Sequence, residues 1–175
     1  LAVDTSPFRV EMEKQRERGR AAWKGALQLP VQNNLKTEFT GYASLTGEGK
    51  IVSIIRADAA VDAVSDKDAG QLCFVLTDRT PFYAEGGGQL GDNGFLKTAA
   101  GSARVVDCRK QGDAFVHLVS DIEGSLNVDE IAELNVDAKR RNALARHHSA
   151  THLLNAALRA KLGAHIRQSG SLVHP

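Results

Sequence analysis

The amino-acid sequence predicts an α+β fold, in which an N-terminal helix precedes an antiparallel β-barrel or β-sandwich and a second helix with a short strand follows it. Between about residues 38 and 136, short segments rich in Val, Ile and Phe alternate with polar turn sequences, which is typical of antiparallel β structure. On both sides of this region, apolar residues recur at helical spacing. The 42% hydrophobic and 25% charged residues are ordinary for a globular protein and argue against long disorder.

The first predicted helix spans residues 7–24. Ser6 suits the N-cap, and Pro7 suits the first helical position because the N–H that proline lacks would have no helical partner there. The apolar stripe of this helix is thin, so we expect it to pack against something outside the sequence or to project into solvent. Residues 25–34 contain Pro30 and are predicted to form a hinge or linker.

The central region is predicted to contain a series of short strands separated by turns rich in glycine, aspartate and asparagine. Their regular spacing favours an antiparallel barrel or sandwich. The expected strands are residues 38–43, 50–57, 71–77, 94–98, 103–109, 114–120 and 131–136.

The second predicted helix begins at Asp137, which suits a helix entry, and ends before Gly163, a natural C-cap residue. Its apolar residues recur every four positions and are expected to form a buried stripe. These residues are Leu154, Leu158 and Leu162. Residues 165–173 are then expected to return as a strand.

Charge is distributed unevenly along the chain. Residues 139–175 contain seven basic and no acidic residues, whereas residues 1–138 contain 15 basic and 21 acidic residues. A basic region at one end can bind a polyanion, although a solvated basic helix is an equally physical reading of charge alone.

Several classes of protein are excluded. No apolar run approaches the ~18 residues that span a bilayer, so we expect no membrane association. Cys73 and Cys108 cannot form a multi-disulfide framework and do not belong to a Cys-x-x-Cys motif. The first residue is Leu1 and no secretion signal is recognised, so we expect a cytoplasmic piece of a longer protein.

Two histidines form the sharpest local motif. His148 and His152 are four residues apart, so on a helix their imidazoles share one face and can converge on a metal ion. Two ligands do not complete a zinc site, and the Glu of a metalloprotease His-Glu-x-x-His motif is missing. A structural role for the pair is the alternative.

A glycine-rich loop over residues 80–94 is the second motif. Three successive glycines, Gly86, Gly87 and Gly88, allow close backbone approach, and the amide of Gln89 directly after them can position a water or a carbonyl group. The alternative is a flexible hairpin turn. The density of polar residues around the glycines exceeds what a plain turn needs.

Three segments in this order resemble alanyl-tRNA synthetases: residues 80–94, residues 140–154 and residues 168–173. More narrowly, they resemble the editing domain that these enzymes share with free-standing AlaX trans-editing proteins. The opening stretch, residues 8–20, is similar to the helix that leads from the tRNA-recognition region of the synthetase into that domain. This likeness favours the synthetase over AlaX.

The resemblance implies three parts. Residues 1–34 would be the helix and linker from the tRNA-recognition region, and residues 35–137 the editing-domain β-barrel. Residues 138–175 would begin a zinc-binding α/β unit related to the editing domain of threonyl-tRNA synthetase. The implied activity is hydrolysis of the ester of mischarged seryl- or glycyl-tRNA(Ala), within an alanine–tRNA ligase whose separate catalytic domain uses ATP.

The resemblance also implies roles for individual residues. Gln89 matches a glutamine implicated in hydrolysis, with Gly87 and Gly88 as the adjoining catalytic backbone, and Thr80 matches a threonine thought to read the serine hydroxyl. Asp92 is predicted as a second substrate contact. His148 and His152 match two of four Zn²⁺ ligands, the others lying in a Cys-x-x-x-His element beyond this sequence. The acceptor end of tRNA(Ala) is expected to contact Arg140, Arg141 and Arg146.

A second hypothesis is a tRNA-binding module, in which the barrel and the basic helix hold tRNA while catalysis resides in the remaining domains of the parent synthetase. The incomplete metal ligand set favours this reading of the sequence on its own.

Overall fold

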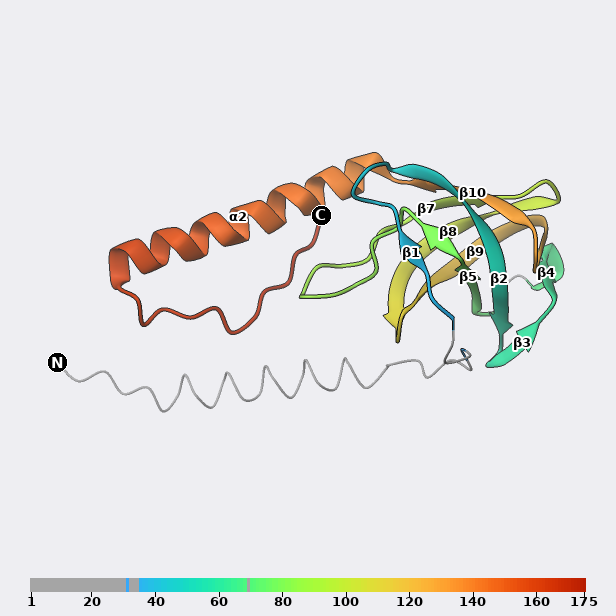
Figure 1. The fold of residues 1–175 in the computed structure, drawn as a ribbon, viewed down its shortest axis with the longest axis horizontal. Helices are drawn as coiled ribbons and strands as arrows, with labels where there is room; N and C mark the ends of the chain where they lie inside the picture. Colours follow the sequence, from blue (N-terminus) through green and yellow to red (C-terminus); the bar gives the residue numbers. More distant parts are fainter. Residues whose placement is uncertain (1–30, 32–34, 69) are drawn as a thin grey trace.

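The structure is a computed structural model that describes residue 31, residues 35–68 and residues 70–175. The predicted helix over residues 7–24 and almost all of the predicted linker lie outside the described residues. The described chain forms a β-barrel from which one long helix projects, and the C-terminal segment runs back along that helix (Figure 1). Within this described part, no helix has the length and apolar character that crossing a membrane requires.

The described elements follow one another as strands, with one short 3₁₀ helix, until the final α-helix. In chain order they are β1 (Glu38–Phe39), β2 (Thr46–Arg56), β3 (Ala59–Val61), β4 (Ala63–Ser65), η1 (Asp66–Asp68), β5 (Cys73–Thr77), β6 (Arg79–Thr80), β7 (Gly94–Lys97), β8 (Gly101–Gln111), β9 (Ala114–Asn127), β10 (Ile131–Val136) and α2 (Ala138–Leu162).

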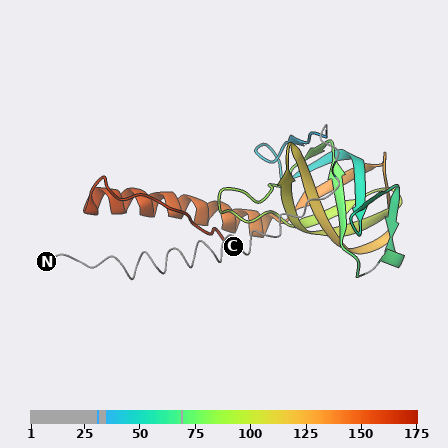
Figure 2. The same ribbon diagram turned by 90° about the horizontal axis from the view of Figure 1, so that it is seen from below.

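Six strands close into an antiparallel barrel in the order β2, β5, β9, β8, β7 and β10, after which β10 pairs with β2 again. The closing pair runs from Ile131 opposite Lys50 to Asn135 opposite Thr46. Register shifts interrupt β2 between Ile51 and Ser53 and β8 at two places. Such bulges bend and twist strands, which allows a small sheet to close. The barrel is therefore confirmed over the sandwich (Figure 2).

The core follows from strand alternation, because successive side chains of a strand point to opposite faces. In β5, every residue is buried. Cys73 and Val75 join the larger apolar cluster, whereas Phe74 and Leu76 join a second cluster that Val31 and Leu35 partly cover. Chain segments before β1 thus cover one outer face of the barrel.

Helix α2 begins as the sequence predicts. The carboxylate of Asp137 accepts hydrogen bonds from the backbone N–H groups of Lys139 (2.9 Å) and Arg140 (3.1 Å), and Gly163 is the C-cap. This capping satisfies two of the N–H groups that have no partner within the helix.

The prediction of a buried leucine stripe on α2 is wrong for the described structure. Leu154, Leu158 and Leu162 are 61%, 39% and 58% exposed, and Leu144 is the buried residue of this helix. The helix has 25 residues and extends away from the barrel, so only its first turns lie beside the strands (Figure 1).

The remaining strand predictions differ in their limits. The strand over residues 131–136 is confirmed as β10, and β2, β8 and β9 are longer than predicted. Of the strand predicted at residues 38–43, only the two residues of β1 are observed as a strand. The strand predicted at residues 165–173 is wrong, since that segment forms only a single bridge, between Val173 and Gln89. The sequence patterns missed β3, β4 and β6.

Candidate active site

The structure brings together the three segments on which the sequence resemblance rests. Loop 81–93 leaves the barrel and extends beside α2, and the C-terminal segment returns to the same place (Figure 1). The backbone N–H of Val173 donates to the carbonyl of Gly88 (2.7 Å), and the N–H of Leu90 donates to the carbonyl of Val173 (3.3 Å). Val173 is 3% exposed.

Gln89 and His148 form the contact that joins the loop to the helix. The Oε1 atom of Gln89 lies 2.7 Å from Nδ1 of His148. Because a carbonyl oxygen only accepts, Nδ1 carries the proton of this bond, and Nε2 is the ring nitrogen that lies outside it. The same bond leaves the amide nitrogen of Gln89, a donor, for another partner. Gln89 is 8% exposed, so its orientation is fixed by this bond and by burial.

His148 and His152 lie on successive turns of α2 with ring centroids 4.8 Å apart and planes tilted by 44°. Metal-bound histidines commonly donate their second ring N–H to a protein oxygen, which fixes the tautomer. The bond from Nδ1 of His148 to Gln89 is of this kind, so Nε2 suits a metal. Among the residues that the structure describes, no group of three or more His, Cys, Asp or Glu could hold an ion. The described residues thus place two histidines together without a complete set of metal ligands.

The glycines of the loop have distinct structural roles. Gly86 and Gln89 exchange two backbone hydrogen bonds of 3.1 and 3.0 Å, which closes a tight turn and occupies the N–H of Gln89. Gly87 and Gly88 sit at φ of +60° and +82°, the left-handed region that glycine favours. A Cβ atom on Gly88 would collide with the carbonyl oxygen of Ser171, whereas a Cβ on Gly87 would meet nothing.

Asp92 and Arg141, predicted to contact substrate and tRNA respectively, are engaged with each other. Nε of Arg141 lies 3.0 and 2.9 Å from the two carboxylate oxygens, and Nη2 also donates to Asp92. The remaining guanidinium donors reach the carbonyls of Gly41 (3.0 Å) and Pro81 (2.8 Å). Asp92 is fully buried and also accepts the N–H of Tyr83 (2.7 Å). In this structure, the pair fastens α2 to two loops of the barrel.

Thr80, predicted to read the serine hydroxyl, is fully buried in β6. Its hydroxyl lies 2.8 Å from Nε2 of His117 and accepts the N–H of Phe82 (3.1 Å). Nδ1 of His117 donates to the carbonyl of Val75 (2.9 Å), so Nε2 accepts the threonine proton. Burial lowers the pKa of His117 from 6.5 to about 4, which keeps the ring neutral. The Thr80 hydroxyl thus uses its proton on His117 and accepts a hydrogen bond from Phe82, both within the protein.

No role was predicted for His117 from the sequence. The apolar neighbours Val116 and Leu118 place it within a strand, but its bond to Thr80 spans 37 residues, and no local pattern could reveal it.

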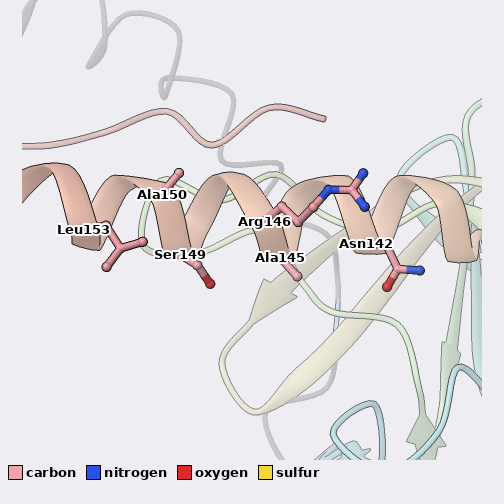
Figure 3. Close-up of a pocket in the computed structure, with 6 residues that line it drawn as sticks. All are labelled: Asn142, Ala145, Arg146, Ser149, Ala150 and Leu153. Carbon is pink, nitrogen blue, oxygen red and sulfur yellow. The ribbon is translucent and has the colours of Figure 1, made fainter.

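Arg140 and Arg146 occupy different environments on α2. Nη2 of Arg140 lies 3.5 Å from the carbonyl of Gly91, and its Nε is buried. Arg146 lies beside an open pocket of about 410 Å³. The pocket lining comes entirely from α2, along one stretch of the helix (Figure 3): Asn142, Ala145, Arg146, Ser149, Ala150 and Leu153. Gln89, His148 and His152 are not among these lining residues.

The described part of the chain is thus a closed β-barrel followed by a basic helix, with Gln89 and His148 in contact between them. The sequence model described as "tRNA synthetases class II (A)" matches residues 1–140, and the chain belongs to this family of synthetases.

Similar full-length proteins make the likeness more specific. The chain is 45% identical over 175 residues to an alanine–tRNA ligase of Nitrosococcus oceani, with 99% of this chain and 20% of the relative aligned. It is 40% identical to the alanine–tRNA ligase of Paracoccus denitrificans (99% and 20% aligned) and 42% identical to that of Nitratidesulfovibrio vulgaris (100% and 21% aligned). The chain thus spans about a fifth of the length of these relatives.

Proposed function

We propose that this chain is the editing portion of an alanyl-tRNA synthetase and hydrolyses the ester of seryl- or glycyl-tRNA(Ala). The observation that supports this most strongly is the 2.7 Å bond between Gln89 and His148, which joins two of the resembling segments across 59 residues. The third segment adds Val173, which exchanges backbone hydrogen bonds with Gly88 and Leu90 of the loop. The names of the similar proteins, alanine–tRNA ligases, point to tRNA and to alanine, and the mischarged serine or glycine comes from the family resemblance.

The chemistry asked of the site is modest because an aminoacyl ester is already activated. A water molecule adds to the carbonyl carbon, the bond from this carbon to the ribose oxygen breaks, and the ribose oxygen takes the proton. Since Oε1 of Gln89 is occupied by His148, Gln89 presents its amide N–H₂ as a donor. A fixed donor of this kind stabilises the oxyanion that develops on the carbonyl oxygen. The N–H of Gln89 itself is bound to Gly86, so this role falls to the side chain.

Zinc belongs to this proposal, held by His148 and His152 together with two ligands supplied by the parent protein beyond this chain. When bound, it would supply Lewis-acid polarisation or an anchor for the substrate amine. Calorimetric titration with Zn²⁺ of this chain and of one extended through the next Cys-x-x-x-His tests the ligand set. We expect tight 1:1 binding in the extended chain only and its loss in His148→Ala.

The basic start of α2 is proposed to lie along the acceptor end of tRNA(Ala). Among the residues that the structure describes, Arg140 and Arg146 form no ion pair like that of Arg141. Phosphate contacts from such residues set position rather than sequence. The other domains of the synthetase would use ATP to attach alanine to the tRNA, in the cytoplasm.

Deacylation of seryl-tRNA(Ala) by the full-length synthetase tests the proposal. We expect Gln89→Ala to slow single-turnover hydrolysis by about 100-fold or more, the usual consequence of losing one oxyanion donor. Gln71→Ala, the same chemical change at an exposed turn of the barrel, is the matched control and should keep the wild-type rate. Hydrolysis by Gln89→Ala at the wild-type single-turnover rate would refute the proposed role of the Gln89 amide.

The alternative of a tRNA-binding module rests on one observation, the two-histidine ligand set of the described residues. It predicts salt-sensitive tRNA binding with no ester hydrolysis even in the full-length protein.

A further inference from the structure

An exposed aromatic side chain stands at one end of a row of aromatic rings. Tyr42 is 92% exposed. Its ring meets Phe39 edge to face at a centroid distance of 4.9 Å, and Phe39 in turn stacks on Phe115 (5.6 Å, 26°) and meets Tyr83 (6.2 Å, 73°). Nζ of Lys110 lies 5.9 Å from the centre of the Phe115 ring. Packing within the described chain therefore leaves most of the Tyr42 ring open to solvent.

The loop that carries Tyr42 is held firmly. The N–H of Thr40 donates to the carbonyl of Thr80 (2.8 Å), and the N–H of Ala43 returns to the carbonyl of Thr40 (3.1 Å). A Cβ atom on Gly41 would collide with the carbonyl oxygen of Pro81 and with the Phe39 ring, so only glycine fits this close approach. Arg141 then donates to the carbonyl of Gly41 (3.0 Å) from α2. Tyr42 is therefore presented to solvent on a fixed support.

The same contacts tie this support to the candidate active site. The ring of Tyr83 touches Phe39, and its hydroxyl lies 3.4 Å from the carbonyl oxygen of Gly86, the residue that closes the turn with Gln89. Figure 1 shows the connection from β1 to β2 beside the start of α2. The basic residues Lys139 and Arg140 lie there, and no acidic residue follows them in the chain.

We propose that Tyr42 is a stacking residue for an unpaired nucleobase at the 3′ end of the tRNA whose ester reaches Gln89. Proteins hold single-stranded nucleic acid by combining basic groups for the backbone with aromatic rings on which bases stack. Tyr42 supplies the ring, and the start of α2 supplies the positive charge. The inference rests on the proposed editing function, from which it takes the identity of the RNA.

The test separates stacking from charge and from hydrolysis. The affinity of this chain for a fluorescently labelled single-stranded RNA ending in CCA is measured by anisotropy, with no ester present, for wild type and Tyr42→Ala. Stacking contributes ~1–3 kcal/mol per base, which corresponds to roughly 5- to 150-fold, and we expect Tyr42→Ala to weaken binding about tenfold. Tyr42→Phe and Tyr42→Trp should stay within about twofold of wild type, because both retain a stacking face.

Two controls sharpen the result. Phe95→Ala removes another exposed ring, 62% exposed on β7, and should leave RNA affinity unchanged. An abasic oligonucleotide of the same length keeps the phosphates and removes the bases, so wild type and Tyr42→Ala should bind it equally.

In full-length synthetase, Tyr42→Ala should raise KM for seryl-tRNA(Ala) and leave kcat unchanged. A loss of RNA affinity without any ester hydrolysis would support the stacking role and refute the editing function. Equal RNA affinity in wild type and Tyr42→Ala, or no binding by wild type, would overturn the stacking role. A Tyr42→Ala variant with normal RNA affinity but a less stable full-length protein would instead assign the ring to an interdomain contact.

Discussion

The ion pair between Arg141 and Asp92 gives the sharpest prediction about stability. Its carboxylate is fully buried and its guanidinium is 15% exposed, and the same guanidinium satisfies the carbonyls of Gly41 and Pro81. Arg141→Met keeps the aliphatic stem but leaves the carboxylate with the N–H of Tyr83 as its remaining described partner. Breaking a buried pair by removing one partner typically costs ~3–5 kcal/mol. We expect a loss of about 4 kcal/mol in the free energy of unfolding.

Urea unfolding followed by circular dichroism at pH 7 measures this loss, and an unchanged slope against urea would show that the unfolded state is unaltered. The double variant Asp92→Asn with Arg141→Met is the control, because it removes the buried charge together with its partner. It should recover part of the stability that Arg141→Met loses. A change below about 1 kcal/mol in Arg141→Met, the range of an exposed ion pair, would refute the reasoning.

Three further predictions concern the barrel and its loop. His117 has a pKa of about 4 when folded and 6.5 when unfolded, so the unfolded chain binds more protons between these values and stability falls as pH drops from 6.5 towards 4. Urea titrations across this pH range should show the free energy of unfolding of wild type fall by an amount on the order of 3 kcal/mol, and His117→Gln should not show this fall. The same pH dependence of stability in both proteins would contradict the prediction. Gly88→Ala should detach the C-terminal segment by colliding with Ser171, seen as faster hydrogen exchange at Val173, whereas Gly87→Ala, strained in φ but free of collision, should leave exchange there unchanged. Thr80→Val should lower the free energy of unfolding by about 1–3 kcal/mol because it leaves Nε2 of His117 buried without a donor, and no loss would mean that the bond is not formed.

Local signals in the sequence located the elements that depend on local interactions. The cap at Asp137 and the strand that became β10 follow from residue type and alternation within a few positions. Barrel closure depends on β10 meeting β2 across some 80 residues, and no local pattern contains this pairing. The leucines of α2 were predicted to be buried because they recur at helical spacing, but in the structure they are exposed. Helical spacing does not indicate whether another surface is present to cover the stripe.

The residues of the candidate site also differ in how much of their environment a local sequence pattern can predict. Gln89 and His148 each lie in a recognisable motif, and the structure brings them together with Val173 of the third resembling segment. The substrate-contact roles of Thr80 and Asp92 stay predictions. In the structure, the Thr80 hydroxyl contacts His117 and the Asp92 carboxylate binds Arg141, partners 37 and 49 residues away in the chain that no local pattern could reveal.

The central claim is that Gln89 and His148 act as one unit in ester hydrolysis. A double-mutant cycle on single-turnover deacylation of seryl-tRNA(Ala) by the full-length synthetase tests it most directly, with Gln89→Ala, His148→Ala and the double variant measured beside wild type. Residues that act as a unit are strongly non-additive, so the double variant should be no slower than the slower single variant. Rate losses that multiply in the double variant, or wild-type hydrolysis by all three variants, would contradict the account.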